Sequence, residues 1–224
     1  MKRLIESKIK LKESNRRICF TIKHPDITKE DTIEFEKSVE NYKKTRKGNF
    51  FEFKPISYNI DIKKEYMQSS RAGNDKPKGL WYCSGDTDND GYTGMHQWIY
   101  WLIMGRYISM YGVSEMDKND NSIFNVNAVV IAEIPSEINI LQIKNKYNLY
   151  DFSNKYSINR YHNWVAVSKN YDGIELFRDA MDREIPLVVG FDIPSGCIWR
   201  GLDKLKIISV TPFGKYVYDN KLYR

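Results

Sequence analysis

The chain has 224 residues, of which 42% are apolar and 29% are charged. This size and composition exclude a wholly disordered or fibrous chain and leave room for one good-sized core, so two full domains are not expected. The net charge of +6 is uneven, because residues 1–50 hold 14 Lys/Arg and 8 Asp/Glu while the rest holds 21 of each. The asymmetry predicts either a basic N-terminal element that meets an acidic partner or a solvated charged face.

Membrane association is not expected, because no window approaches the roughly 18 consecutive apolar residues that a span needs. No Sec-type signal is visible, although export by a needle-type system stays open. The three cysteines, Cys19, Cys83 and Cys197, are odd in number and widely spaced. That pattern fits neither a disulfide framework nor a zinc site, so we expect reduced, cytosolic thiols.

The first fifty residues predict a strand followed by a helix. Arg16–Lys23 alternates β-branched and aromatic residues, which is typical of a strand. Thr28–Asp31 has the pattern of a capping box, and the helix after it extends to about Lys47, before Gly48, with an apolar stripe of Phe35, Val39 and Tyr42. We therefore assign residues 1–47 to a small basic strand–helix element that selects the substrate, and residues 48–224 to a catalytic domain.

The rest of the chain mixes strands and helices without regular spacing or an internal repeat. The alternation in Phe50–Ile62 predicts a strand, with Pro55 at an edge or a bulge. Further strands are predicted at 79–83, 126–134, 138–143, 187–193, 197–199 and 206–210, and helices at 95–111, 147–156 and 163–169. These elements predict an α+β fold with a mixed or antiparallel sheet.

Several common site motifs are missing from the sequence. Neither a dinucleotide-binding glycine pattern nor a P-loop occurs, and the three histidines follow no zinc-binding pattern. Asp86–Gly91 reproduces the first half of an EF-hand loop, but the twelfth position is Gln97, which cannot give a bidentate carboxylate. We therefore expect no metal requirement.

Three blocks are dense in glycine, aromatic and acidic residues: Lys76–Ser84 (KPKGLWYCS), Tyr171–Leu176 (YDGIEL) and Gly190–Trp199 (GFDIPSGCIW). At strand ends such residues let the backbone approach a ligand and aim a side chain into a cleft. Asp172 and Glu175 are three positions apart, so a regular strand separates them on opposite faces, whereas a turn at Gly173 brings them together. For the aromatic residues of these blocks, packing in the core is the competing interpretation.

In this order, with an aromatic helix between the first and second, the blocks resemble a group of phage and bacterial proteins with a PARP-like ADP-ribosyltransferase fold. The resemblance covers about Phe50–Val210. Within that superfamily the chain is similar to bacterial effectors that ADP-ribosylate a threonine of ubiquitin and use an Asp-Glu pair. The resemblance implies a split β-sheet core with flanking helices, NAD as co-substrate, and either a cytoplasmic protein or a secreted effector acting in the host cytosol.

The same resemblance implies an NAD site around the first block, from Lys78 through Gly79, Leu80, Trp81 and Tyr82 to Ser84. Gly79–Tyr82 is similar to the GxYF strand that floors the nicotinamide pocket, where Tyr82 would stack on nicotinamide and Ser84 would support the catalytic acid. The chain departs from the family in having no Glu-x-Glu pair and no histidine that opens a His-Tyr-Glu triad. Lys54, on the candidate first strand, is the nearest stand-in for that histidine.

The chemistry of nicotinamide release also fits the acidic residues directly. Cleavage passes through an oxocarbenium-like state, which needs a carboxylate beside the ribose and a wall that excludes water. Glu175 is the candidate carboxylate, and Asp172 or Asp192 is the candidate base that activates a Thr or Ser hydroxyl. We predict a monomeric mono-ADP-ribosyltransferase that acts on a protein, with ubiquitin as the first acceptor to test.

Two other classes of function stay open. One is an NAD- or nucleotide-binding module without turnover, and the other is an ADP-ribosyltransferase that modifies nucleic acid. The charge-balanced body disfavours the second, because proteins that track a nucleic-acid backbone spread Lys and Arg along the cleft.

Overall fold

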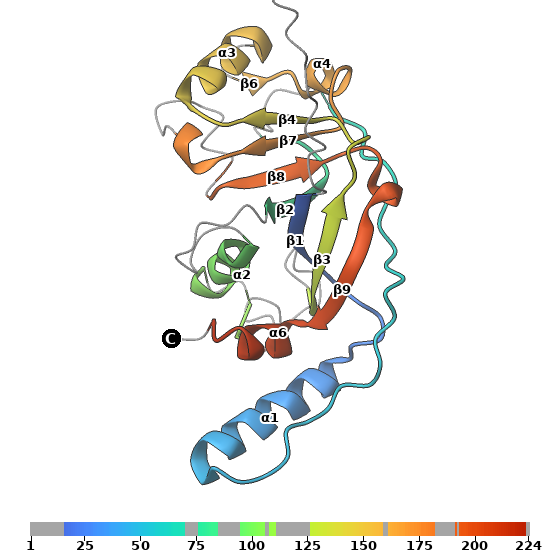
Figure 1. Cartoon of the computed structure of the whole chain (residues 1–224), viewed down its shortest axis with the longest axis vertical. Coiled ribbons are helices and arrows are strands. Elements are labelled where there is room, and N and C mark those ends of the chain that lie inside the picture. The colour runs from blue at the N-terminus through green and yellow to red at the C-terminus, as the bar shows by residue number, and fades with distance from the viewer. Residues whose placement is uncertain are drawn as a thin grey trace, which may run out of the picture.

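A seven-stranded sheet forms the centre of the computed structural model, which describes residues 16–69, 76–84, 95–105, 108–110, 126–158, 161–181, 191 and 193–222 (Figure 1). Its strand order is β4-β7-β8-β2-β1-β3-β9. Among the described strands only the β4–β7 pair is parallel, which confirms an α+β fold with a mixed sheet. The strands are β1 Arg16–Ile22, β2 Leu80–Ser84, β3 Ala128–Ile134, β4 Ile140–Ile143, β7 Gly173–Leu176, β8 Ser195–Ile198 and β9 Lys206–Pro212.

Helices pack around this sheet, and a two-stranded hairpin lies beyond β4. The hairpin consists of β5 Ser157–Ile158 and β6 Tyr161–His162, which the sequence analysis did not predict. The helices are α1 Lys29–Thr45, α2 Met95–Met104, α3 Lys146–Tyr156, α4 Trp164–Ser168 and α6 Phe213–Asp219, with 3-10 turns at Arg178–Ala180 and Leu202–Lys204. α2 ends at Met104, earlier than the predicted 95–111.

The sheet is covered on both faces. On one face, α3 and α4 pack against β4, β7 and β8, while α2 and α6 pack against β1 and β3. The opposite face of β1, β2, β3 and β8 packs against the stretch of chain from Phe53 to Tyr66. The largest fully buried side chains are Trp164, Trp199, Tyr82, Phe20, Phe191 and Phe213.

The stretch of chain that covers this face differs from its predicted secondary structure. Phe50–Ile62 was predicted to be a strand, but no strand is described between residues 50 and 69. Its alternating apolar residues do pack inward, through Phe53, Ile56, Ile60 and Ile62, against the face of the sheet. A segment lying on a sheet face has no neighbouring strand to bond, and Pro55 has no N–H to donate.

The predicted N-terminal strand and helix both form. Thr28 Oγ1 accepts a hydrogen bond from Asp31 N (3.0 Å), and Asp31 Oδ2 accepts one from Thr28 N (2.9 Å), so the capping box is confirmed. β1, however, lies in the middle of the sheet, paired with β2 on one side and with β3 on the other. Residues on the two sides of position 47 therefore build one sheet.

Within the described ranges, no helix is long and apolar enough to cross a membrane. The EF-hand-like stretch Asp86–Gly91, the catalytic candidate Asp192 and most of the predicted strand 187–193 lie outside the described residues.

Candidate functional site

The three sequence blocks form three neighbouring strands. β8, from the third block, lies between β7 from the second and β2 from the first. In this register Glu175 is opposite Gly196, and Gly196 is opposite Tyr82. Residues opposite each other on neighbouring strands share a face, so Glu175 and Tyr82 lie on the same side of the sheet with a glycine between them.

Glu175 forms an ion pair with Arg16, the first residue of β1. The Glu175 side chain is 1% exposed and that of Arg16 is 17% exposed. Oε1 of Glu175 and Nε of Arg16 have no hydrogen-bond partner among the described residues. Burying charges is costly unless they are paired and fully hydrogen-bonded. These two charges are paired with each other, but each side chain keeps one polar atom whose hydrogen bond is not satisfied within the described residues.

Tyr82 completes the cluster beside Arg16. Burial raises the pKa of the Tyr82 phenol far above its usual range, and the nearby Arg16 cation opposes that shift. The ring packs against Gly196 so closely that a Cβ there would be 2.1 Å from Tyr82 Cζ. Because the ring is fully buried, Tyr82 is part of the core in this structure, and its predicted stacking on nicotinamide stays a prediction.

Asp172 has partners of its own. Its Oδ1 accepts a hydrogen bond from Arg200 Nε (2.5 Å), and its Oδ2 accepts one from Asn139 N (2.9 Å). Its carbonyl oxygen accepts bonds from the backbone N–H groups of Trp199 and Arg200. The structure thus gives Asp172 and Glu175 separate ion-pair partners, and Asp172 joins the start of β7 to the end of β8 and to the chain before β4.

The remaining predicted cofactor residues divide between the two faces of β2. Leu80 lies on the face of Tyr82, whereas Trp81 lies on the other face, with its ring 5.0 Å from that of Phe191. Lys78 is exposed, and its backbone N–H and carbonyl both bond the Gln68 side chain. A Cβ at Gly79 would be 2.4 Å from Ile198 O, so this glycine permits the close approach of β2 and β8.

Two further candidates are not part of the Arg16–Glu175 cluster as described. Lys54 is exposed and lines a groove between the covering stretch, α1, β9 and α6. Ser84 ends β2 opposite Ile18, one pair further along than Cys83 and Cys19, but its side chain lies outside the described residues.

The cysteines are all free and buried. Burial raises the pKa of the Cys19 thiol to about 12 and holds the pKa values of Cys83 and Cys197 well above their usual range. Thiols in this state are poor nucleophiles, so none of the three is a candidate catalytic group.

Sequence reasoning missed Arg16 as the partner of Glu175. A local signal was present, because Arg16, Ile18 and Phe20 are two positions apart and therefore share a face of β1. The pairing itself joins residues 159 positions apart and depends on the order of the strands. It also missed the groove that contains Lys54, since this groove combines residues 35–58 with residues 210–219.

Within the described part of the chain, no group of three or more His, Cys, Asp or Glu side chains is placed to hold a metal ion. No family model matches the chain, and neither the curated proteins nor the solved structures give a significant match.

Proposed function

We propose that this protein is a mono-ADP-ribosyltransferase that transfers ADP-ribose from NAD to a hydroxyl group of a protein acceptor, with Glu175 as the catalytic carboxylate. The observation that carries the proposal is the convergence of the three blocks on neighbouring strands, where Glu175, Gly196 and Tyr82 form one row across β7, β8 and β2. These are the blocks on which the resemblance to ADP-ribosyltransferases rests.

The unsatisfied hydrogen-bonding atoms of Glu175 and Arg16 support this assignment. Glu175 Oε1 is a buried acceptor without a partner among the described residues, and a ribose hydroxyl of NAD would supply a donor. Arg16 Nε is a donor that has no partner in the part of the chain that the structure describes, and a phosphate oxygen of the same molecule would accept its hydrogen bond. Because Arg16 is the more exposed partner, we expect its guanidinium to leave Glu175 and move to the diphosphate when NAD binds.

The proposed reaction exchanges one bond at the ribose C1′ for another. The bond between C1′ and the nicotinamide nitrogen breaks, and its electron pair leaves with neutral nicotinamide. Positive charge then develops on the ribose, and the Glu175 carboxylate offsets it at a site from which water is excluded. The acceptor oxygen bonds to C1′ and loses its proton to a base, for which Asp172 and Asp192 stay the candidates of the sequence.

The second candidate function is a nucleotide-binding module without turnover, in which Glu175 has a structural and not a catalytic role. Glu175 is 1% exposed and already ion-paired with Arg16, and a purely structural ion pair would be buried in the same way. The two functions differ in nicotinamide release, since a binding module takes up NAD without cleaving it.

The test measures nicotinamide release and NAD binding for the full chain, with and without protein acceptors that include ubiquitin. Glu175→Gln keeps a hydrogen-bond acceptor for Arg16 but removes the charge, so it should lower release about a hundred-fold or more while preserving the thermal unfolding transition. Glu137→Gln is the matched control, because Glu137 is an exposed carboxylate in the turn after β3.

Release by Glu175→Gln within about ten-fold of the unaltered protein would reject Glu175 as the catalytic group. NAD binding without any release by the unaltered protein would favour the binding module instead.

A further inference from the structure

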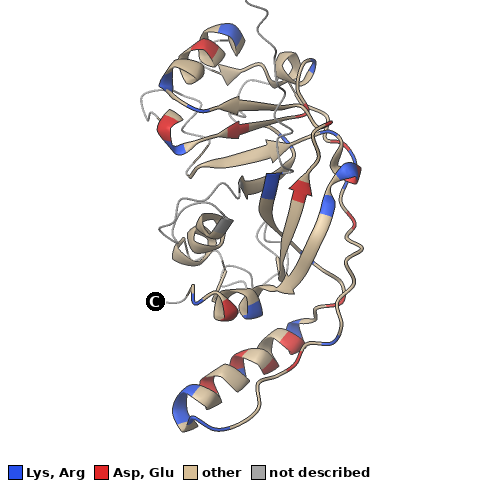
Figure 2. Ribbon diagram, viewed as in Figure 1, with Lys and Arg blue, Asp and Glu red and all other residues tan. Residues whose placement is uncertain are grey.

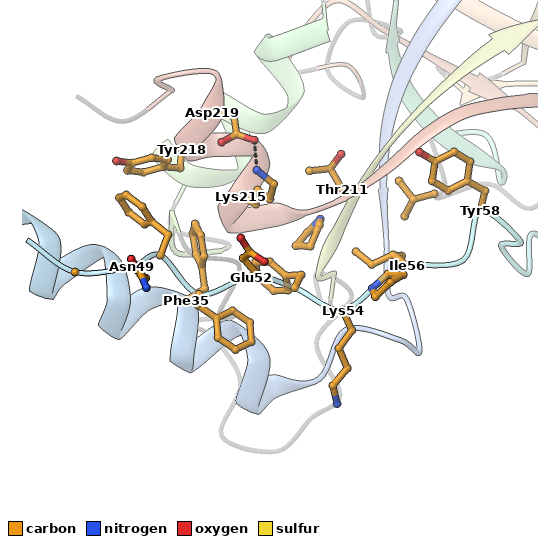
Figure 3. Close-up of a pocket in the computed structure, with 17 residues that line it drawn as sticks. Phe35, Asn49, Glu52, Lys54, Ile56, Tyr58, Thr211, Lys215, Tyr218 and Asp219 are labelled. Atoms are coloured by element: carbon orange, nitrogen blue, oxygen red, sulfur yellow. Dashed lines mark hydrogen bonds and ion pairs between the residues drawn. The ribbon is translucent and has the colours of Figure 1, made fainter.

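A large groove lies between the covering stretch, the end of β9 and α6 (Figure 3). Its lining residues include neither Arg16 nor Glu175. Its volume is about 1210 Å³. One wall is the chain from Gly48 to Ile56 together with Phe35 of α1, and the other is formed by the end of β9 and by α6. Six of its 17 lining residues are aromatic, and its charged groups are Glu52, Lys54, Lys215 and Asp219.

Both walls carry peptide groups that have no backbone hydrogen-bond partner among the described residues. β9 is the last strand of the described sheet and pairs with β3 along one edge. In an antiparallel edge strand, alternate N–H and C=O groups point away from the sheet. Within the described chain, residues 49–58 make no backbone–backbone hydrogen bond, and their main-chain bond is the one from Ser57 N to Asp26 Oδ2 (3.0 Å).

The end of α1, which leads directly into the lining residues Gly48 and Asn49, is basic. Residues 43–58 hold five Lys/Arg and one Asp/Glu. Lys44, Arg46 and Lys47 are exposed at the C-terminal end of α1, and Figure 2 shows Lys and Arg gathered at that tip. The lining itself is charge-balanced, because Lys215 is paired with Asp219 (2.6 Å) and Lys54 is matched in number by Glu52, so the basic excess comes from the α1 tip.

We propose that this groove binds an acidic, extended polypeptide segment of a partner protein. An extended peptide supplies both donors and acceptors for the two rows of peptide groups, as in strand addition to a sheet edge. Its acidic side chains meet the basic tip of α1, and its apolar side chains enter the aromatic walls. This proposal does not depend on the proposed transferase activity. That activity would matter only if the bound segment were also the protein acceptor of ADP-ribose.

The same observations argue against nucleic acid as the occupant. A phosphate backbone offers acceptors alone, so it leaves the C=O groups of both walls unpaired. The aromatic rings are also engaged with one another, with 5.3 Å between the ring centres of Phe35 and Phe53 and 5.1 Å between those of Phe50 and Tyr218. They are therefore not free platforms for stacking bases.

The experiment measures fluorescence anisotropy of three labelled probes with the full chain and no NAD. The probes are a ten-residue peptide of alternating Glu and Val, its counterpart of alternating Lys and Val, and a ten-nucleotide oligo-dT. The test variant combines Lys44→Glu, Lys47→Glu and Lys54→Glu. The matched control combines Lys155→Glu, Lys169→Glu and Lys204→Glu, which changes the net charge equally at exposed positions outside the groove.

We expect the acidic peptide to bind, the test variant to weaken it at least about ten-fold and the control variant to weaken it less than about three-fold. Bound peptide should also slow amide exchange in residues 49–58. Tighter binding of oligo-dT, equal binding of the basic peptide, equal loss in both variants or no binding at about 1 mM would each overturn the proposal. None of these results bears on nicotinamide release, so the transferase proposal stands or falls separately.

Discussion

Arg16 on β1 is ion-paired with Glu175 on β7, although β2 and β8 lie between their strands in the sheet. On the face of the sheet that carries Glu175, the residue between Glu175 on β7 and Tyr82 on β2 is Gly196 on β8. This position therefore has no side chain between Glu175 and Tyr82. The buried charge of Glu175 and the packing of Tyr82 are therefore both tied to the absence of a side chain at residue 196.

The glycine at position 196 gives a stability prediction. A Cβ there would be 2.1 Å from Tyr82 Cζ, so Gly196→Ala should lower the free energy of unfolding by about 1–3 kcal/mol through overpacking. Adding Tyr82→Leu removes the clashing ring atoms, so the double variant should lose less than the sum of the two single losses. Urea unfolding of all four proteins measures this coupling, and strictly additive losses would show that the two residues do not contact in the folded protein.

Removal of residues 1–47 should abolish folding. β1 contributes Ile18, Cys19 and Phe20, each 0% exposed, and it pairs with both β2 and β3. Its loss separates two parts of the sheet and opens the core, so circular dichroism of the truncated chain should show no cooperative thermal transition. A truncated protein that melts cooperatively would instead establish the N-terminal element as a separate unit.

The capping box predicts a pH dependence for α1. Hydrogen bonds from the backbone and hydroxyl of Thr28 lower the pKa of Asp31, so its ionised form stabilises the folded helix. This contribution is present above the unfolded pKa of about 3.9 and is lost as the pH falls through the lower folded value. Asp31→Asn should therefore reduce stability at pH 6 by up to about 1 kcal/mol, and the difference should shrink at pH 3.

Urea unfolding of the unaltered and Asp31→Asn proteins at the two pH values checks this expectation. An equal difference at pH 6 and pH 3 would show that the ionisation of Asp31 does not stabilise α1.

The sequence predicted correctly those elements that are determined by residues close together in the chain. The alternation in Arg16–Lys23 and the capping box at Thr28 gave β1 and α1, because a strand face and a helix cap are set by neighbouring residues. The same alternation in Phe50–Ile62 gave a wrong strand, since it predicts which side chains are buried but not whether another strand is available for pairing.

The candidate site was likewise predictable only in part. Composition identified the three blocks that become β2, β7 and β8, but their adjacency depends on the strand order of the whole sheet. The partners of the acidic residues, Arg16 for Glu175 and Arg200 for Asp172, are distant from them in sequence, so no local pattern predicts these two pairings. The assignment of NAD to this site stays a prediction.

The most direct test of Glu175 as catalytic carboxylate compares Glu175→Leu with the double variant Arg16→Met, Glu175→Leu. The single variant leaves Arg16 buried without its partner and should cost about 3–5 kcal/mol of stability, whereas the double variant replaces the pair with apolar side chains and should restore much of that loss. Thermal unfolding measures this restoration. We predict that the folded double variant releases nicotinamide at least about a hundred-fold more slowly than the unaltered protein. A double variant that is folded and releases nicotinamide within about ten-fold of the unaltered rate would contradict a catalytic role and leave the pair a structural one.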